Sequence, residues 1–424
     1  MTILQVFWVA WLMAAICIGL VWAFRFGFLV LTSKGRPVLN GRSHERVGPV
    51  AILNPRVSVL VAAKDEESNI EACVTGLLAQ DYPNLEVIVI DDRSRDRTPA
   101  ILVQLLARPE DADSPTRLRV MTIGTLPEGW CGKNHAMREG ARASTGEWLL
   151  FTDADCRMTS PRALTVAVRE VLAHEADFLS IIPVLETPTV WERLLQPACA
   201  LLLILWFLPH RVNDPARKTA YANGAFMLVQ RKCYDAIGGH ERVRGEVNED
   251  VHMARFAKRM GFRLRVVENT DLYRTRMYAT PRQAWRGWSR ILYGCLGTLR
   301  RLAISAVMVV TYTIVPWVSL AVALGGWILA GPDHAAPWKW AVAAWAAVVI
   351  VQQVTLWRIY RGLQIPGIWS LGHVAGAAAT VGMLANAALK VIGATGTEWR
   401  GTSYRARGTA QLAVGPAEEA PRSA

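Results

Sequence analysis

The chain has 424 residues, of which 52% are hydrophobic and only 19% carry a charged side chain, and its mean hydropathy is +0.21. Globular domains contain about 25% charged residues, so the apolar surplus must be concentrated where water does not reach it. This composition excludes an intrinsically disordered chain, a collagen-like fibre and a small disulfide scaffold. It is typical of a membrane protein with a sizeable soluble part.

The formal net charge of +12 is the second general feature of the chain. The basic residues do not form a compact run interleaved with stacking aromatic residues, so no nucleic-acid partner is predicted. They gather next to apolar stretches, as Arg25, Arg300 and Arg358 do, where an anionic membrane leaflet would attract them. The seven cysteines are scattered and include no C-x-x-C pair, so neither a disulfide framework nor a zinc site is predicted.

The first apolar stretch predicts a transmembrane anchor within residues 1–31. Residues 1–24 carry no charged side chain, and Gln5–Phe24 provides about 20 mostly apolar residues, the length that a bilayer-spanning helix needs. Arg25 follows this run and no basic residue precedes it, which differs from a secretory signal peptide. The positive-inside tendency then places the N-terminus outside and the following chain in the cytoplasm.

A run of short β-branched segments alternating with helical stretches predicts a cytoplasmic α/β domain over residues 32–300. This order builds a mostly parallel, doubly wound sheet that is covered on both faces. We expect helices to begin near Ser68, Thr98 and Asn134, and a fourth helix to have Ser160 as its N-cap. The predicted strands are Val57–Ala63, Leu85–Asp91, Arg117–Ile123 and Trp148–Asp153.

A shorter apolar run, Leu194–Pro209, lies inside this otherwise soluble region. It has 16 residues, which is short for a bilayer crossing. Aromatic and basic residues flank it, a pattern that favours a helix over residues 191–210 lying in the plane of the membrane interface. A helix buried in the core of the soluble domain is the alternative interpretation.

Three further uncharged stretches lie between residues 301 and 395, at Leu302–Ala330, Trp340–Trp357 and Gly362–Leu389. The first two predict transmembrane helices. The third is rich in Gly and Ala and contains several polar residues, so it either spans the membrane, re-enters it or lies against the other helices. We therefore expect two to three C-terminal transmembrane helices, followed by a partly disordered tail over residues 396–424.

Polar clusters follow three of the predicted strands, at Lys64–Glu67, Asp91–Asp96 and Asp153–Asp155. Ligands of open α/β sheets bind outside the carboxyl ends of the strands. Taken singly, an Asp-rich turn before a helix is often only a helix cap. Three acidic clusters at one sheet edge, however, would repel one another unless a cation lay among them. The pattern predicts a divalent cation, Mg²⁺ or Mn²⁺, whose coordination is completed by substrate phosphate oxygens.

The spacing of Asp153 and Asp155 sharpens this prediction. Residues i and i+2 of an extended chain point to the same side, so both carboxylates can reach one ion or its waters. The segment Gly129–Lys133 (GWCGK) forms a flexible loop that opens a helix. Free N–H groups, the helix dipole and the Lys133 ammonium would all favour a diphosphate at this place.

The order of these motifs along the chain resembles that of a known family. The segments are VSVLVAAKDEE (57–67), DDRSRD (91–96), Gly132-Lys133, GEWLLFTDAD (146–155), NGAF (223–226), GGH (238–240), Glu249-Asp250 and QAWRGW (283–288). As an ordered set they resemble the membrane-bound family-2 glycosyltransferases, over about residues 55–295. The resemblance implies a GT-A-type nucleotide-sugar-binding domain. One helix before this domain and a few after it resemble the ceramide-glucosyltransferase and hopanoid-associated branch, which uses lipid acceptors.

The resemblance also implies a role for each matched residue. Asp153 and Asp155 would bind the metal, and Asp250 would be the general base that takes the proton of the acceptor hydroxyl. A helix-dipole acid is the alternative interpretation of Asp250, which lies at the apparent start of a helix. The implied nucleotide-sugar-binding residues are Lys64, Asp65, Glu66, Asp92, Lys133 and Asp153. The implied acceptor-side residues are Glu249, Asn223, Gly224, Gln283, Arg286 and Trp288.

Elementary chemistry agrees with these implied roles. Breaking a sugar–phosphate bond requires neutralisation of the charge on the leaving nucleoside diphosphate, and a carboxylate on the opposite face must accept the proton of the attacking hydroxyl. The chain also departs from the family in two places. Gln283-x-x-Arg286-Gly287-Trp288 has one residue inserted before the Trp of the family's Q/R-x-x-R-W motif, and Asp65 stands where Asn is more usual.

The sequence thus predicts an integral, multi-pass membrane enzyme whose catalytic domain lies at the cytoplasmic face of a bacterial inner membrane. It would move a sugar from a nucleotide diphosphate sugar to a lipid hydroxyl, with a metal ion and with inversion. Sphingoid, hopanoid, carotenoid and polyprenyl lipids are the candidate acceptors. The alternatives are a processive polysaccharide synthase, which the altered Q/R-x-x-R-W motif disfavours, and a non-catalytic membrane scaffold that keeps the fold.

Overall fold

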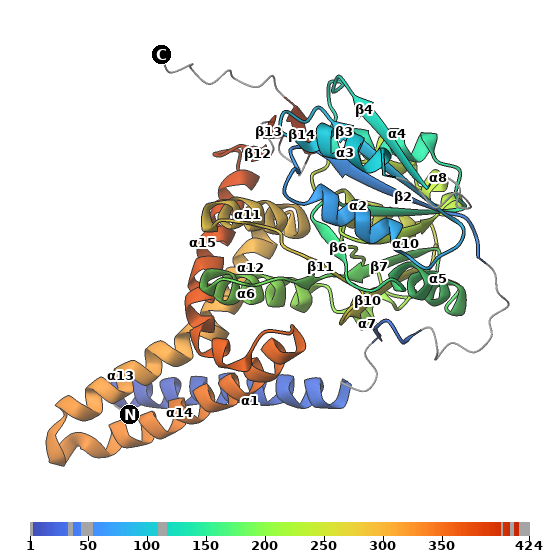
Figure 1. Ribbon diagram of the computed structural model, residues 1–424. Helices are drawn as coiled ribbons and strands as arrows, with labels where there is room; N and C mark the ends of the chain where they lie inside the picture. Colours follow the sequence, from blue (N-terminus) through green and yellow to red (C-terminus); the bar gives the residue numbers. More distant parts are fainter. Residues whose placement is uncertain are drawn as a thin grey trace. The chain divides into compact units, whose positions relative to one another are not determined.

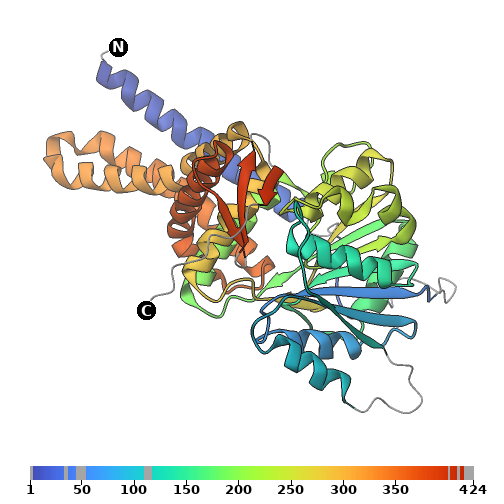
Figure 2. The same ribbon diagram turned by 90° about the horizontal axis from the view of Figure 1, so that it is seen from above.

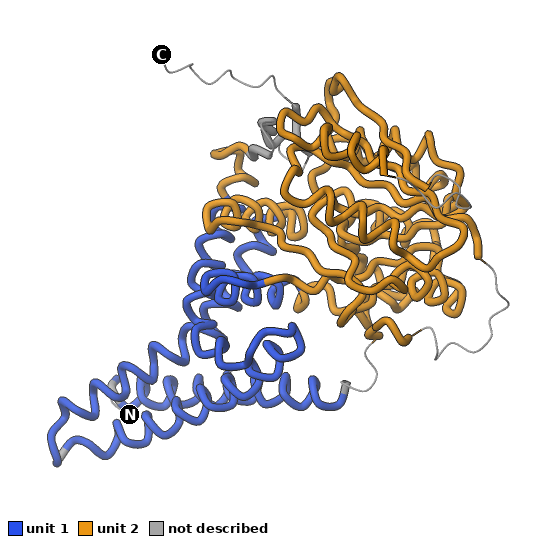
Figure 3. The backbone as a smooth tube through the Cα atoms, viewed as in Figure 1, with its two compact units in different colours: residues 1–36, 187–203, 298–388 blue, residues 37–186, 204–297, 389–424 orange. Residues whose placement is uncertain are grey.

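The computed structural model describes residues 3–32, 37–43, 54–108, 117–399, 402–407 and 411–414. Its chain forms two compact units, coloured blue and orange in Figure 3. The first unit contains residues 1–36, 187–203 and 298–388, and the second contains residues 37–186, 204–297 and 389–424. The second unit contains most of the predicted α/β domain, but residues 187–203 group with the apolar helices and residues 389–424 group with the α/β unit.

The α/β unit is built on an eight-stranded sheet (Figure 1). Its strands are β1 (Val38–Leu39), β2 (Val57–Ala63), β3 (Leu85–Asp92), β4 (Leu118–Ile123), β5 (Trp148–Asp153), β7 (Phe178–Ile182), β9 (Met227–Gln230) and β10 (Leu264–Asn269). Their spatial order is β1-β10-β7-β9-β5-β2-β3-β4. Every pairing is parallel except the two made by β9, which runs antiparallel to β5 and β7. The four predicted strands and the mostly parallel sheet are confirmed.

Helices cover both faces of this sheet, and accordingly all eight residues of β3 are buried. The helices α2 (Ile70–Leu78) and α3 (Thr98–Leu106) lie on one face, and α4 (Gly132–Ala143) packs across β2 and β3 on the other (Figure 2). The prediction for α5 was wrong at its start. This helix runs from Ala163 to Ala173 with Arg162 as its N-cap, because Ser160 belongs to a preceding turn in which its Oγ accepts the Arg162 N–H.

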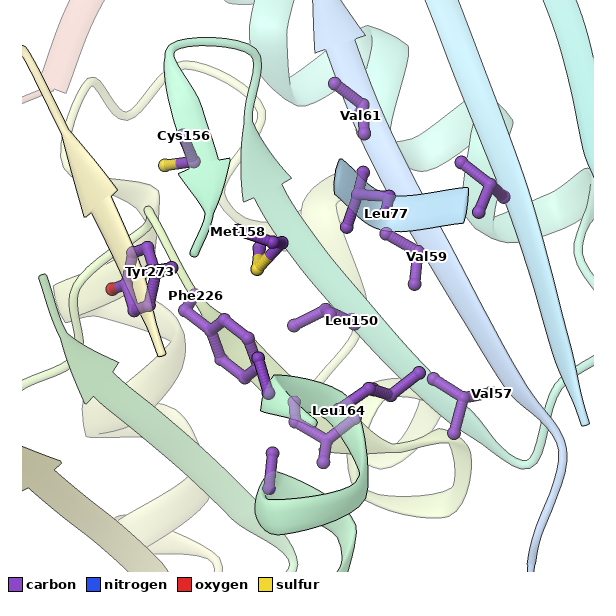
Figure 4. Close-up of a cluster of buried hydrophobic side chains, with 14 of the residues drawn as sticks. Val57, Val59, Val61, Leu77, Leu150, Cys156, Met158, Leu164, Phe226 and Tyr273 are labelled. Atoms are coloured by element: carbon purple, nitrogen blue, oxygen red, sulfur yellow. The ribbon is translucent and has the colours of Figure 1, made fainter. Parts of the chain in front are cut away.

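The core of the α/β unit fixes the register of its central strands. Val57, Val59 and Val61 alternate along β2 and are fully buried, on the same side as Leu77 of α2 and Leu150 of β5 (Figure 4). Shifting β2 by one residue would turn this apolar set away from the core. The packing of these valines therefore determines which residues stand at the carboxyl end of each strand.

The strand order changes direction at β2. The chain runs from β2 to β3 and β4 on one side, and returns through α4 to β5 on the other side of β2. Ligand-binding crevices of open α/β sheets form at such a switch point. The register places Ala63 beside Asp91 and Ala62 beside Asp153, so the carboxyl ends of β5, β2 and β3 are neighbours. The three predicted acidic clusters therefore meet at one edge.

Smaller elements complete the α/β unit. They are β6 (Cys156–Met158), β8 (Val184–Leu185), α7 (Pro209–Val212), α8 (Arg231–Ala236), α9 (Gly239–Arg242), α10 (Glu249–Arg259), β11 (Tyr273–Thr275) and α11 (Pro281–Leu296). The predicted C-terminal tail contains three short antiparallel strands, β12 (Thr397–Trp399), β13 (Thr402–Arg407) and β14 (Gln411–Val414). Residues 400–401, 408–410 and 415–424 of that tail lie outside the described residues.

The other unit is helical. It comprises α1 (Ile3–Thr32), most of α6 (Val190–Trp206), α12 (Leu299–Val309), a π-helical turn η3 (Val310–Ile314), α13 (Val315–Leu329), α14 (Gly331–Gly362), a 3₁₀ turn η4 (Gly367–Gly372) and α15 (His373–Val391). In the part of the chain that the structure describes, five helical stretches are long and apolar enough to cross a membrane. They are Gln5–Leu31, Val190–Val212, Leu299–Leu329, His334–Gly362 and Gly367–Val391.

The length argument for the run at Leu194–Pro209 needs correction. Helix α6 begins before this run and α7 extends it, so the helical stretch Val190–Val212 has 23 residues rather than 16. A stretch of this length meets the requirement for a bilayer crossing. Its placement in the plane of the interface therefore stays a prediction that length alone no longer favours.

Candidate active site

A cavity of about 200 Å³ lies in the α/β unit at the carboxyl ends of β5, β2 and β3. The loops after these strands, the first turn of α4, the segment around Asn223 and the loop before α10 form its wall. Its charged lining residues are Lys64, Glu66, Asp92, Arg93, Lys133, Asp153, Asp155, Glu246, Glu249 and Arg290. The structure thus brings most of the sequence-predicted charged residues into one cavity, although they come from five separate parts of the chain.

Lys133 links two carboxylates from different elements. Its Nζ lies 2.7 Å from Asp153 Oδ1, at the end of β5, and 2.7 Å from Glu249 Oε1, at the start of α10. Burial acts to lower the pKa of Lys133, but the charges of the two carboxylates outweigh it, and the pKa is raised. The ammonium group therefore stays charged next to the N-terminal N–H groups of α4, an arrangement that favours phosphate oxygens.

Asp250 lies next to this ion pair, on the first turn of α10. Its Oδ2 accepts the Gly224 N–H at 2.8 Å and its Oδ1 accepts the Val251 N–H at 2.7 Å. Burial and the neighbouring Glu249 charge raise the pKa of Asp250 to about 7, against Lys133 and the two N–H donors. A carboxylate with a pKa near neutrality is well matched to proton abstraction. Asp250 is partly exposed and is not itself one of the residues that line the cavity.

Asp153 and Asp155 form the pair that could hold a metal ion. Burial, followed by the charges of Asp153 and Glu66, raises the pKa of Asp155 to about 7. A divalent cation would relieve this repulsion between carboxylates. No group of three or more His, Cys, Asp and Glu side chains among the described residues could hold a metal ion by itself. The two carboxylates fit Mg²⁺ or Mn²⁺, which take their remaining ligands from water and phosphate oxygens.

The predicted nucleoside-binding turn after β2 is only partly in the cavity. Lys64 and Glu66 line it, whereas Asp65 does not. The Asp65 N–H donates to Ser94 Oγ at 3.0 Å, and Asp65 Oδ1 accepts the Arg95 N–H at 2.8 Å. Asp65 therefore joins the loop after β2 to the loop after β3, and its carboxylate serves this connection.

Asp92 lines the cavity together with Arg93, a residue that the motif analysis did not single out. The Arg93 backbone has a φ of 57°, an uncommon value for a residue with a side chain. This turn directs the guanidinium back onto Asp92, with Nε 2.7 Å from Oδ1 and Nη2 2.9 Å from Oδ2. The cavity wall at the end of β3 is thus an ion pair rather than a lone carboxylate.

Helix α11 does not bring its three predicted acceptor-side residues into the cavity. Gln283 completes a capping box with Thr280 at the start of the helix, Arg286 is exposed, and Trp288 is buried in the core at 3% exposure. Arg290, one turn after Arg286, lines the cavity instead. Residues i and i+4 lie on the same face of a helix, so the spacing contained a signal for Arg290 that the motif obscured. The other predicted acceptor-side residues, Glu249, Asn223 and Gly224, lie at the site.

The family model for "Glycosyltransferase like family 2" matches residues 55–287, more than half of the chain. The chain belongs to the family-2 glycosyltransferases. The matched range contains every strand of the eight-stranded sheet except β1, and every charged cavity residue except Arg290. The family and the GT-A-type fold that the motifs predicted are confirmed.

Individual relatives share less of the chain. The β-monoglucosyldiacylglycerol synthase of Synechocystis sp. is 31% identical over 199 residues, which are 44% of this chain and 37% of that protein. The 4,4'-diaponeurosporenoate glycosyltransferase of Staphylococcus haemolyticus is 22% identical over 238 residues, 56% of this chain and 60% of that protein. The solved structure of a Pyrobaculum calidifontis mannosyltransferase covers 90% of this chain and 98% of its own, at 18% identity and a TM-score of 0.49. The match therefore spans less than two thirds of either curated relative.

Proposed function

We propose that this glycosyltransferase moves one sugar from a nucleotide diphosphate sugar to a lipid hydroxyl at the cytoplasmic face of a bacterial inner membrane. The observation that carries the proposal is the arrangement around Gly224. Lys133 Nζ, Glu249 Oε1 and Asp250 Oδ2 all lie within 3.5 Å of the position that a Cβ would take on Gly224. Lys133 also pairs with Asp153, and Asp250 accepts the Gly224 N–H. A cation for a leaving phosphate and a base for an attacking hydroxyl are thus held by one short stretch of backbone.

The donor side of the proposed reaction belongs to Lys133, the α4 N-terminus and the Asp153/Asp155 pair. Lys133 and the N–H groups of α4 would bind the diphosphate, and Lys64, Glu66 and Asp92 would face the nucleoside. A Mg²⁺ or Mn²⁺ ion held by Asp153 and Asp155 would neutralise charge on the leaving nucleoside diphosphate. The side chains present fit that ion because they offer hard oxygen ligands and leave positions for phosphate.

The acceptor side belongs to Asp250. In the proposed step its carboxylate takes the proton of the acceptor hydroxyl while the hydroxyl oxygen attacks the anomeric carbon and the nucleoside diphosphate leaves. Lys133 bridges Asp153 to Glu249, the residue before Asp250. For the proposed inversion, Asp250 would act on the face of the sugar opposite the leaving group. The N–H donors on both oxygens of Asp250 would hold its orientation during proton transfer.

Two observations support a lipid as the acceptor. Five helical stretches of the described chain have the length and composition of membrane spans. Two relatives are named for work on lipid-like molecules, one as a synthase of monoglucosyldiacylglycerol and one as a glycosyltransferase of diaponeurosporenoate. An acceptor dissolved in the bilayer would explain why a catalytic domain is joined to so much apolar helix.

Release of nucleoside diphosphate tests the proposal. Detergent-solubilised protein is incubated with a panel of nucleotide sugars, total bacterial lipid and Mg²⁺ or Mn²⁺, and Asp250→Asn is compared with Asp235→Asn, an exposed control outside the cavity. We expect release that requires lipid and metal and falls by at least 10²-fold in Asp250→Asn only. Product found only in a water-soluble polymer would contradict a lipid acceptor and favour a polysaccharide synthase. Donor binding without any turnover would favour the scaffold.

A further inference from the structure

Glu246 is a cavity carboxylate that the proposed mechanism does not use. It lies four residues before Asp250 in the loop between α9 and α10, and its side chain is 15% exposed. Glu246 is not part of a metal-binding group, since no such group of three His, Cys, Asp or Glu occurs among the described residues. An ionised carboxylate repels phosphate oxygens and only accepts hydrogen bonds. Its natural partners in a nucleotide-sugar site are therefore the neutral hydroxyl groups of the sugar.

The loop that carries Glu246 is held firmly against α4. The buried Asn134 side chain donates through Nδ2 to the carbonyl oxygens of Val243 (2.8 Å), Arg244 (3.3 Å) and Glu246 (2.8 Å). The Cys131 N–H donates to the Arg244 carbonyl at 2.7 Å, beside Lys133 in the same turn. The loop is thus anchored to the helix end at which the diphosphate is proposed to bind. A side chain placed in this way is preorganised relative to the donor.

The His252 ring lies next to the Glu246 carboxylate. Its Nε2 lies 3.5 Å from Glu246 Oε2. Burial, assisted by Arg255 and Arg259, lowers the pKa of His252 to about 4, so the imidazole is neutral near pH 7. Burial raises the pKa of Glu246 to about 7, against the charge of Arg255 on α10. Burial, followed by the charge of Glu246, raises the pKa of Tyr293 on α11.

We propose that Glu246 selects the sugar of the donor: it accepts hydrogen bonds from the hydroxyl groups of a neutral hexose and excludes a sugar that carries a carboxylate. This proposal rests on the function proposed above. Two carboxylate oxygens match a pair of adjacent sugar hydroxyls, and such charge-assisted hydrogen bonds are among the stronger ones in proteins. A uronate would bring a second negative charge next to Glu246, which is a repulsive contact that discriminates between donors.

Equilibrium binding tests this inference without requiring turnover. The full-length protein in detergent with Mn²⁺ is titrated with UDP-glucose, UDP-galactose, GDP-mannose and UDP-glucuronate, and with UDP and GDP alone. We expect wild type to bind one neutral nucleotide hexose at least tenfold more tightly than the uronate. Glu246→Gln should raise the Kd of the hexose donor at least tenfold and change the Kd of the free nucleoside diphosphate less than twofold. The difference in affinity between the hexose donor and the uronate donor should become smaller. Glu246→Asp keeps the negative charge but moves the carboxylate back by one methylene group, so it should also lower the affinity for the hexose donor.

The matched control is Glu241→Gln, a half-exposed glutamate five residues earlier that pairs with Arg138 outside the cavity. It should bind every ligand as wild type does, and melting temperatures establish that all variants are folded. The inference is overturned if Glu246→Gln binds the hexose donor as tightly as wild type does. It is also overturned if the affinity of this variant for the free nucleoside diphosphate falls as much as its affinity for the hexose donor. Selective hexose binding without turnover would uphold the role of Glu246 while contradicting the proposed transferase reaction.

Discussion

At the scale of single residues, Gly224 is a position in the active site where charged side chains pack closely against the backbone. A Cβ at this position would lie 3.0 Å from Lys133 Nζ, 3.4 Å from Glu249 Oε1 and 3.5 Å from Asp250 Oδ2. A side chain here would push against the ammonium group and its partner carboxylates. Glycine therefore leaves room for the ammonium group and the two carboxylates to meet on one side of its Cα.

The environment of Asp250 leads to a prediction for the pH dependence of activity. Its pKa is raised to about 7 by burial and by Glu249, and a general base must be ionised to act. We therefore expect kcat/KM to rise about tenfold per pH unit below pH 6 and to level off above pH 8. Initial rates across a pH series, at saturating metal, measure the profile. A flat profile between pH 5.5 and 8 would remove Asp250 from the role of the base.

Arg290 and Arg286 give a prediction that separates the sequence motif from the structure. Arg290 lines the cavity, whereas Arg286, one turn earlier, is exposed and does not. A cation in a cavity for an anionic donor contributes to binding, so Arg290→Gln should lower kcat/KM at least tenfold, while Arg286→Gln should change it less than threefold. Steady-state kinetics of the two variants, side by side, make the measurement. The reverse ranking would mean that the motif, and not the cavity, identifies the functional arginine.

At the scale of elements, a close crossing of α6 and α15 organises the helical unit. A Cβ on Gly376 would lie 2.0 Å from the Leu194 carbonyl oxygen, and a Cβ on Gly372 would lie 2.3 Å from Leu194 Cδ2. One turn further along α15, Thr380 Oγ1 lies 3.4 Å from Cys199 Sγ. Small residues at four-residue spacing let two helix backbones approach in this way. The helix predicted to lie in the membrane interface is thus packed against a second apolar helix.

This crossing yields a stability prediction. Gly376→Ala places a methyl group against backbone, which cannot move aside as a flexible side chain can, so we expect it to lower the melting temperature in detergent by several degrees. Gly325→Ala is the matched control, because a Cβ there meets nothing within 4 Å and α13 is helical at that position. Thermal unfolding followed by intrinsic fluorescence compares the two variants. Equal melting temperatures would show that α6 and α15 do not pack this closely.

A second feature of the helical unit is a break in helical hydrogen bonding whose free carbonyl is bound by side chains of other helices. Pro316 lacks an N–H, and the turn before it is π-helical over Val310–Ile314. The Tyr312 carbonyl accepts instead from Trp22 Nε1 at 2.8 Å and from Gln352 Nε2 at 3.1 Å. A carbonyl in an apolar environment needs such partners. These two side chains therefore tie α1 and α14 to the break.

At the scale of the whole molecule, the distribution of apolar and basic residues indicates how the chain meets a membrane. Apolar side chains of α1 remain exposed, among them Phe7, Leu20 and Phe24, as is expected for a surface in contact with lipid. Arg25 follows them directly and no charged residue precedes it. The positive-inside tendency predicts that the α/β unit, which follows this helix, lies in the cytoplasm.

Cysteine accessibility tests this orientation. Asp235 is exposed on α8 of the α/β unit, and of the seven native cysteines only Cys17 is exposed. Asp235→Cys in a Cys17→Ser background should react with a membrane-impermeant maleimide in inside-out vesicles and stay unlabelled in intact spheroplasts. The background variant alone gives the control. Labelling of spheroplasts would place the catalytic domain on the outer side and contradict the proposed location.

The order and approximate positions of the strands and apolar helices could be predicted from the amino-acid sequence alone. Strand positions such as Val57–Ala63, the apolar helices and the acidic clusters at strand ends are local signals, because hydrophobic periodicity and turn residues act over a few neighbouring positions. The ordered motifs then identified the family. Even the meeting of Asp91, Asp153 and Lys64 at one edge followed from the rule that parallel strands end together.

Which of these side chains line the cavity depends on the tertiary structure and could not be predicted from the sequence. Asp65 and Gln283 bind backbone groups, and Trp288 fills the core. Glu246 and Arg290 enter the site without belonging to the recognised motifs, and Arg93 enters it from the DDRSRD segment without having been predicted as a site residue. A residue's direction depends on the register of its strand, the rotation of its helix and the partners that compete for it. Packing between segments far apart in the chain fixes these three properties, and no local pattern encodes them. The hydrogen bond from the Asn134 side chain to the Glu246 carbonyl is one example.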